Sequence, residues 1–120
     1  MTLVCGDRHT LARLEVQAFD LSEKGDGLPY FRRMMSILHK VLPKPGIEAD
    51  KIIYEFTTEE RDNIYPSLGQ NMIWILNGEL EVMDYLEIQD GKATVTKKGE
   101  EKLEKYKASL STEEREALKM

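Results

Sequence analysis

The side chains in this sequence that are best suited to chemistry are one cysteine, two histidines and several adjacent carboxylates. Cys5 and His9 are four residues apart, so on a helix they would share one face and offer two ligands to zinc. A structural zinc site needs four ligands, and the other histidine, His39, is distant in the sequence. A Cys-His catalytic pair needs an electropositive pocket and a third, orienting group, and no residue pattern supplies them. We therefore expect no metal site here.

The adjacent carboxylates Glu59-Glu60 and Glu100-Glu101 stand near the starts of expected helices. Negative charge at a helix N-terminus stabilises the helix, so these pairs are interpreted as caps. No glycine-rich phosphate loop, dinucleotide fingerprint or His-Glu metal pattern occurs. The sequence therefore predicts no catalytic residue, no cofactor and no enzyme. An active site built from residues far apart in the chain is the one kind that spacing does not test.

Chemistry suited to nucleic acids is present in two forms. The amide side chains of Gln70, Asn71 and Asn77 are of the type that reads base edges. Basic side chains, which bind phosphates and release counterions, form two groups. The chain has 17 basic and 22 acidic residues, so its net charge of -5 repels polyanions unless these groups share a face. The first group is Arg32, Arg33 and Lys40, and the second is Lys92, Lys97 and Lys98.

Two amphipathic segments come first among the elements that position these side chains. Leucine and alanine recur at helical spacing over Thr10 to Glu23, between a capping Thr10 and a terminating Gly25. A second helix is predicted from Pro29 to Leu42, because proline is accepted in a first helical turn and the apolar residues gather on one broad side. The other side is predicted to be polar and basic, with Arg32, Arg33, Ser36, His39 and Lys40.

The stretch that follows predicts short elements. The sequence PKPG at 43–46 breaks the chain, and Glu48 to Phe56 is compatible with a short helix. Thr57 and Glu60 have the spacing of a capping box, which predicts further helix as far as Tyr65, and Pro66 ends it.

Residues 68–83 fit two interpretations. As a helix, they place apolar residues such as Ile73, Leu76 and Leu80 on one stripe. As strands, they would turn at Asn77-Gly78, which is a strong hairpin signal. The downstream pattern favours the helix. That helix leaves Trp74, Ile75 and Val82 outside the main stripe, as either a subunit interface or a surface buried by the N-terminal helices.

The last third of the chain predicts a hairpin followed by helices. Tyr85 to Gln89 and Lys92 to Thr96 alternate in character around Asp90-Gly91, which tolerates the positive φ angles of a tight turn. Thr96 is placed to cap the next helix, and Gly99 lets the first turn of that helix approach the strand closely. Ser111 and Glu114 form a second capping box and predict a short final helix.

The order helix, hairpin, Thr-x-x-Gly-x-x-x-Leu helix resembles the winged helix-turn-helix family, especially small prokaryotic regulators. The resemblance covers roughly Glu48 to Leu110. It implies a DNA-reading helix at 68–83 and a wing tip at 90–92. The chain departs from that family because no Lys or Arg occurs between Asp62 and Gly91, which forfeits phosphate contacts. The matching residues are Leu80, Met83 and Leu86 before the wing, then Val95, Thr96, Gly99 and Leu103 after it.

We therefore predict a mainly α protein with a small β-hairpin, which is winged helix-like. We expect one domain over 1–120, with an N-terminal helical extension at 1–46, a core at 47–110 and a C-terminal helix at 111–120. Two partners fit this fold: double-stranded DNA, bound by a transcription regulator, or another protein chain, with a homodimer expected. The N-terminus is charged and the sequence has no long apolar run, so we expect a cytoplasmic protein without a membrane partner.

Overall fold

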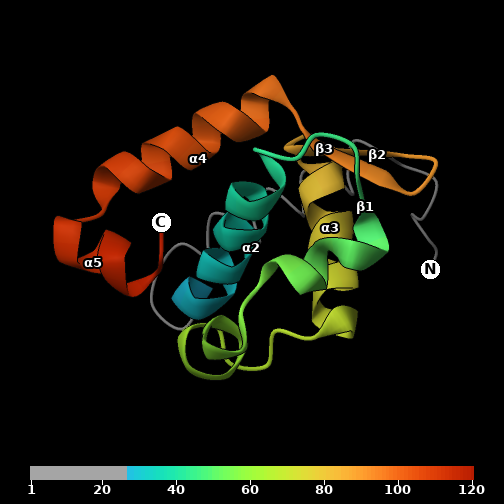
Figure 1. Cartoon of the computed structure of the whole chain (residues 1–120). Coiled ribbons are helices and arrows are strands. Elements are labelled where there is room, and N and C mark those ends of the chain that lie inside the picture. Colours follow the sequence, from blue (N-terminus) through green and yellow to red (C-terminus); the bar gives the residue numbers. More distant parts are fainter. Residues whose placement is uncertain (1–26) are drawn as a thin grey trace, which may run out of the picture.

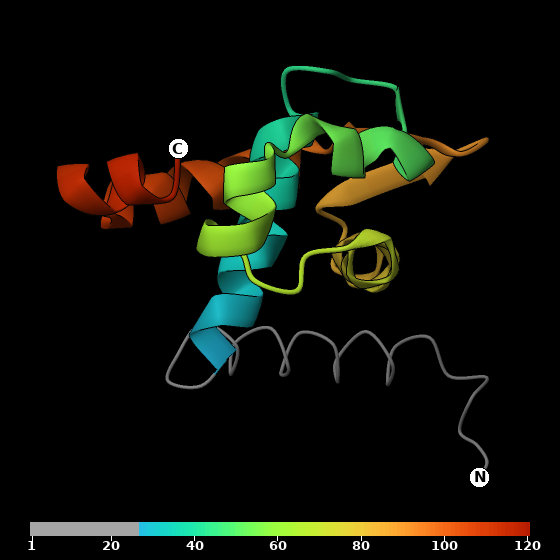
Figure 2. The same ribbon diagram turned by 60° about the horizontal axis from the view of Figure 1, so that its bottom comes forward.

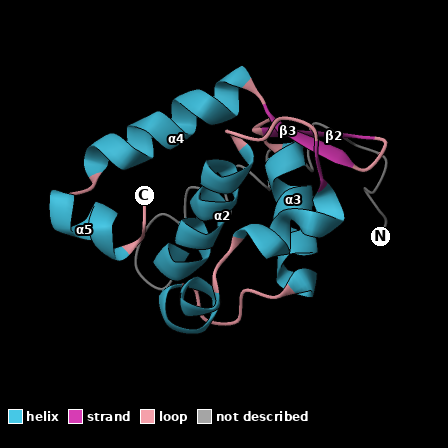
Figure 3. Ribbon diagram, viewed as in Figure 1, coloured by secondary structure: helices cyan, strands magenta, loops and turns pink. Residues whose placement is uncertain are grey.

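The computed structural model describes residues 27–120, which are mainly helical with one small antiparallel sheet (Figure 1, Figure 3). This confirms the predicted fold class of a mainly α protein with a small hairpin. The helix expected over Thr10 to Glu23, together with Cys5 and His9, lies outside the described residues. In chain order the elements are α2 (Leu28–Val41), β1 (Ile47–Glu48), η3 (Ala49–Glu55), η4 (Glu60–Ile64), α3 (Gln70–Val82), β2 (Leu86–Gln89), β3 (Lys92–Val95), α4 (Lys97–Ser109) and α5 (Thr112–Ala117).

Helix α2 lies at the centre of the buried core. Pro29 is in its first turn, where the missing N–H leaves no helical hydrogen bond unmade. Both α3 and α4 pack against this helix. Ser36 was predicted on the polar side of this helix, and this prediction is wrong. The side chain is buried and donates a hydrogen bond to the carbonyl of Arg33. The reason is that α2 is covered on more than one side.

The predicted hairpin is confirmed as β2 and β3, which are joined by Asp90 and Gly91 with φ angles of 53° and 75°. The sheet has a third strand, β1, and the strand order is β1-β3-β2. Strand β1 was not predicted, because its two residues pair only through a tertiary contact. The Gly46 N–H donates to the carbonyl of Ala93 at 2.9 Å, and the predicted short helix therefore begins after β1 as the 3₁₀-helix η3.

The predicted capping box before η4 is confirmed. The Thr57 N–H donates to Glu60 Oε1 at 2.9 Å, and the Glu60 N–H donates to Thr57 Oγ1 at 3.1 Å. These reciprocal bonds satisfy two amides at the start of the turn. The residues that follow form a single π-helical turn, η4, instead of an ordinary α-helix.

Residues 70–82 form one continuous helix, so the helical interpretation is confirmed and the alternative hairpin at Asn77-Gly78 is wrong. Ile73, Leu76 and Leu80 are fully buried on its inner side. Figure 2 views α3 nearly along its axis, with α2 on one side and the hairpin above it. Burial of an apolar stripe at helical spacing therefore outweighs the local turn preference of Asn-Gly.

Helix α4 begins at the predicted cap. Thr96 Oγ1 accepts from the Gly99 N–H at 3.0 Å and donates to the carbonyl of Asp84 at 2.6 Å. A Cβ at Gly99 would lie 2.1 Å from the carbonyl oxygen of Tyr85, so the predicted close approach is also confirmed. These contacts fix the angle at which the helix leaves the hairpin.

The C-terminal helix α5 follows α4 after a turn, and the end of the chain comes back toward α2 (Figure 1). Its predicted capping box is present, with bonds between Ser111 and Glu114 in both directions. The hydroxyl of Tyr65 donates to the carbonyl of Leu118 at 2.8 Å, which ties the end of the chain to the segment after η4. One cluster of buried apolar residues extends from α2 to Leu118. The predicted division into an extension at 1–46, a core at 47–110 and a C-terminal helix at 111–120 stays a prediction.

Candidate functional site

The outward side of α3 carries a stripe of exposed side chains, which we call the outer face of α3. Three of them are large and apolar: Trp74, Ile75 and Val82 are 54%, 56% and 46% exposed. Within the described residues these side chains lie outside the core. The sequence predicted such a second apolar patch, away from the main stripe of the helix. The outer face consists of Asn71, Trp74, Ile75, Gly78, Glu81 and Val82.

Two hydrogen bonds to η3 position the N-terminal half of this face. The indole N–H of Trp74 donates to Asp50 Oδ1 at 3.2 Å. The side-chain amide of Gln70 donates to the carbonyl of the same aspartate, also at 3.2 Å. The Trp74 ring therefore has a defined orientation although it is exposed. Sequence spacing missed this anchor because Asp50 and Trp74 are joined only by the tertiary packing of η3 on α3.

The charges on and near α3 are acidic. The Tyr30 hydroxyl donates to Glu79, while Glu81 and Asp84 are exposed at the C-terminal end of the helix. The first turn contains no acidic residue, the last turn contains no basic residue, and the N-cap Gly69 makes no side-chain cap bond. Both ends of the helix dipole therefore lack compensating charge within the helix.

The basic residues predicted on α2 have structural partners. Arg33 Nε donates to the carbonyl of Pro66 at 3.0 Å. The Arg32 guanidinium lies beside the Tyr106 hydroxyl, where its charge opposes the burial that raises the pKa of this phenol. Lys40 pairs with Glu60 at 2.9 Å. These side chains therefore already contact neighbouring elements, and the phosphate-binding role expected for the basic side of α2 stays a prediction.

Glu60 shows how tightly this network is built. Burial of the carboxyl acts to raise its pKa, but hydrogen bonds from Thr57 and the Lys40 ammonium outweigh burial and leave the pKa below its usual value. The Glu60 side chain is 2% exposed, and Lys40 also lies 5.4 Å above the centre of the Phe56 ring. The ion pair is therefore a packing element and leaves Lys40 poorly placed to bind phosphate.

The three predicted base-reading residues have different environments. Asn77 is buried, with 3% exposure, because it lies on the side of the helix that carries Ile73 and Leu80; its prediction as a base reader is wrong. Gln70 is partly buried and held by Asp50. Of these three side chains, Asn71 is the exposed one.

The predicted basic residues at the hairpin and α4 are exposed. Lys92 pairs in register with Glu48 on β1 and Gln89 on β2, so it has polar neighbours on both sides. Lys97 is exposed at the start of α4, and the Lys98 ammonium lies 5.5 Å from the centre of the Tyr85 ring. These three lysines are more accessible than the basic residues of α2.

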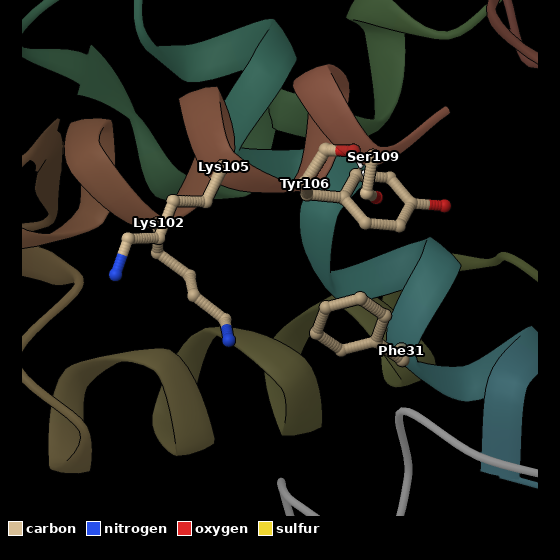
Figure 4. Close-up of a pocket in the computed structure, with 5 residues that line it drawn as sticks. All are labelled: Phe31, Lys102, Lys105, Tyr106 and Ser109. Atoms are coloured by element: carbon tan, nitrogen blue, oxygen red, sulfur yellow. Dashed lines mark hydrogen bonds between the residues drawn. The ribbon is translucent and has the colours of Figure 1, made fainter. Parts of the chain in front are cut away.

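A cavity of about 280 Å³ lies beside α4 (Figure 4). The Lys102 ammonium lies 5.6 Å from the centre of the Phe31 ring, and the Ser109 hydroxyl donates to the carbonyl of Tyr106. Figure 4 shows that the ammonium groups of Lys102 and Lys105 point in different directions. The cavity therefore lacks the converging charges of an anion site.

Between residues 27 and 120, no group of three His, Cys, Asp or Glu side chains is arranged to hold a metal ion. None of the helices in this range has the length and apolar character that crossing a bilayer requires. Comparison of the chain with protein-family models, with curated proteins and with solved structures finds no match. The function is therefore inferred from the residues and their geometry.

Proposed function

We propose that this protein is a winged-helix-like module that docks a protein chain through the outer face of α3. The observation that carries the proposal is the exposure of Trp74, Ile75 and Val82 together on one helix. Exposed apolar groups gathered on one surface, with an aromatic residue among them, are typical of protein interfaces. The indole held by Asp50 offers a partner a large apolar contact whose orientation is already set.

The order of elements supports the winged-helix part of the proposal. Helix α3 leads directly into the hairpin β2–β3, and the hairpin leads through the Thr96 cap into α4. This is the order that the sequence resemblance implies. The close contact between Gly99 and Tyr85 supports the role given to the Thr-x-x-Gly pattern in fixing the helix on the hairpin.

Charge favours a protein over DNA as the partner of α3. A helix in the major groove approaches phosphates on both sides and gains affinity from basic residues. The stretch from Asp62 to Gly91 contains none, and Glu81 lies on the outer face itself. With Asn77 buried and Gln70 partly buried, Asn71 is the one of these three amide residues on α3 that is exposed for reading bases.

Site-specific photo-crosslinking in cells tests the proposal. A photoreactive phenylalanine analogue replaces Ile75 in one variant and the exposed Tyr54 of η3, which is outside the face, in a matched control. We expect a discrete crosslinked product from position 75 that is lost when Val82→Glu is added, and none from position 54. Equal products from both positions, or no product from position 75, would contradict docking through α3.

A second candidate function is DNA binding, as the winged-helix resemblance implies. The exposure of Lys92, Lys97 and Lys98 near the hairpin favours it. Titration of labelled duplex DNA at low and moderate salt tests it, because phosphate contacts make affinity fall steeply with salt. A lack of binding at low salt, or binding that salt does not weaken, removes this candidate. For either function we propose a cytoplasmic location.

A further inference from the structure

We infer that the chain docked on the outer face of α3 is a second copy of this protein, with the two α3 helices antiparallel and crossing at Gly78. This inference rests on the proposed function and names its partner. Three properties of α3 carry it: the symmetric placement of Trp74 and Val82 about Gly78, the open space at that glycine, and the charges at the two ends of the helix.

Two of the three exposed apolar residues are placed symmetrically about Gly78, and the third, Ile75, has Glu81 as its symmetric counterpart. Trp74 precedes it by four residues and Val82 follows it by four. In an antiparallel pair that crosses at Gly78, Trp74 of one copy therefore lies opposite Val82 of the other, and each contact occurs twice. This is the self-complementary arrangement that a two-fold dimer requires.

Gly78 itself suits a crossing point. A Cβ at this position would meet no atom of residues 27–120 within 4 Å, and Gly78 is exposed. Glycine in a helix interior lowers helix stability, and here no close packing within the described residues requires it. A glycine between Trp74, Ile75 and Val82 leaves a notch that allows another helix to approach closely.

The end charges of α3 favour the antiparallel direction. Its N-terminal end has no acidic residue and no side-chain cap, while its C-terminal end carries Glu81 and is followed by Asp84. In this register Asp84 of one copy lies opposite residue 72 of the other, next to the amide of Asn71 and near the positive N-terminal end of that helix, while Glu81 lies opposite Ile75. Parallel packing would instead bring each Glu81 against its own copy, and juxtaposed like charges disfavour association.

The dimer is expected to be weak. A helix of 13 residues is roughly 20 Å long, so contact through α3 alone buries less surface than a standard stable interface. We expect a reversible equilibrium between monomer and dimer at micromolar to millimolar concentration. Measurements that sample about 1 µM to about 1 mM cover the affinities of such complexes.

Cysteine crosslinking of the full chain tests both the partner and the direction. In a Cys5→Ser background, Gly78→Cys places two thiols at the predicted crossing, within reach of a disulfide. Under mild oxidation we expect a covalent dimer from Gly78→Cys at concentrations where the unmodified chain associates. Asn71→Cys should give little, because antiparallel packing separates its two copies, and Tyr54→Cys provides the background level.

Equal dimer yields from Asn71→Cys and Gly78→Cys would overturn the antiparallel arrangement. Sedimentation equilibrium of the uncrosslinked chain provides an independent measurement: Ile75→Glu should abolish association, because it faces Glu81 of the other copy in this register, and Tyr54→Glu should leave association unchanged. A chain that stays monomeric over the whole range overturns the inference of a second copy. If photo-crosslinking at position 75 then yields a product with a different chain, the proposed docking function stands and only this inference fails.

Discussion

Helices α2 and α3 are neighbours of similar length, but their outward-facing side chains have different environments. On α2, Arg33 and Lys40 contact Pro66 and Glu60, so residues that look available in the sequence stabilise the fold. On α3, Trp74, Ile75 and Val82 remain exposed within the described residues. The charged side chains of α2 therefore contact other parts of the fold, whereas these apolar side chains of α3 are not packed in the core.

This difference shows that residue type alone does not identify a binding surface. A basic side chain is available to a partner only if the fold gives it no carboxylate or carbonyl to contact. An apolar side chain becomes notable when the fold leaves it uncovered. By this criterion the outer face of α3 is the stronger candidate for a binding surface. Substitutions on α2 and α3 test whether its residues are distinct from those that stabilise the fold.

The largest effect is expected from the inner side of α3. Leu80→Ala should lower the free energy of unfolding by about 2–5 kcal/mol, because Leu80 is fully buried and its truncation leaves a cavity. Val82→Ala on the outer face should change it by no more than about 0.5 kcal/mol. Urea denaturation of the dilute monomer measures both. Similar losses for the two variants would show that Val82 belongs to the core.

A smaller effect is expected from α2. Lys40→Ala should destabilise the fold by about 1–3 kcal/mol, because it leaves the buried carboxylate of Glu60 without its ammonium partner. Lys98→Ala, which removes an exposed lysine from α4, should have an effect within about 0.5 kcal/mol. Denaturation curves at pH 7 compare the two variants. If Lys40→Ala is as harmless as Lys98→Ala, the basic side of α2 is available after all.

A substitution at Gly78 is expected to stabilise the monomer. Gly78→Ala should raise the stability of the monomer by about 0.5–1 kcal/mol, because alanine is the better helix former and its Cβ meets open space. The same change should weaken self-association by filling the notch. Thermal unfolding and sedimentation separate these effects. Gly99→Ala is the contrasting variant, and it should lose stability because its Cβ would clash with Tyr85.

The smallest expected effect is the contribution of His39 to the pH dependence of stability. Burial, together with the charges of Lys107 and Lys40, lowers the pKa of His39 below 6.5, while Glu60 acts to raise it. The unfolded chain therefore binds a proton more readily than the folded one. Stability should fall as the pH drops below about 6.5 and through the folded pKa. His39→Gln should flatten the profile between pH 7 and 5, as measured by urea denaturation at each pH, and an equally steep profile in this variant would contradict the prediction.

Much of the fold was predictable because it depends on local signals. The caps at Thr57, Thr96 and Ser111 and the turn at Asp90-Gly91 each use residues close in sequence, and all four are present. Strand β1 was missed because two residues carry no periodicity and their pairing partner lies far along the chain.

The candidate site was predicted in part. Helical periodicity located Trp74, Ile75 and Val82 away from the core, since that calculation needs only the helix itself. It did not indicate the contacts of Arg33 and Lys40 or the burial of Asn77, which depend on how η4 and the other elements pack around α2 and α3. Periodicity assigns a residue to a side of its own helix, and tertiary packing determines whether that side is covered.

The accessibility of Trp74 to a neutral quencher such as acrylamide tests the central claim most directly, because it is the single tryptophan in the chain and lies on the outer face. Its fluorescence is measured as protein concentration rises from about 1 µM to about 1 mM. We predict that quenching weakens and emission shifts to the blue with concentration in the unmodified protein, and that Ile75→Glu shows neither change. Quenching that stays the same at every concentration in both proteins would contradict the account.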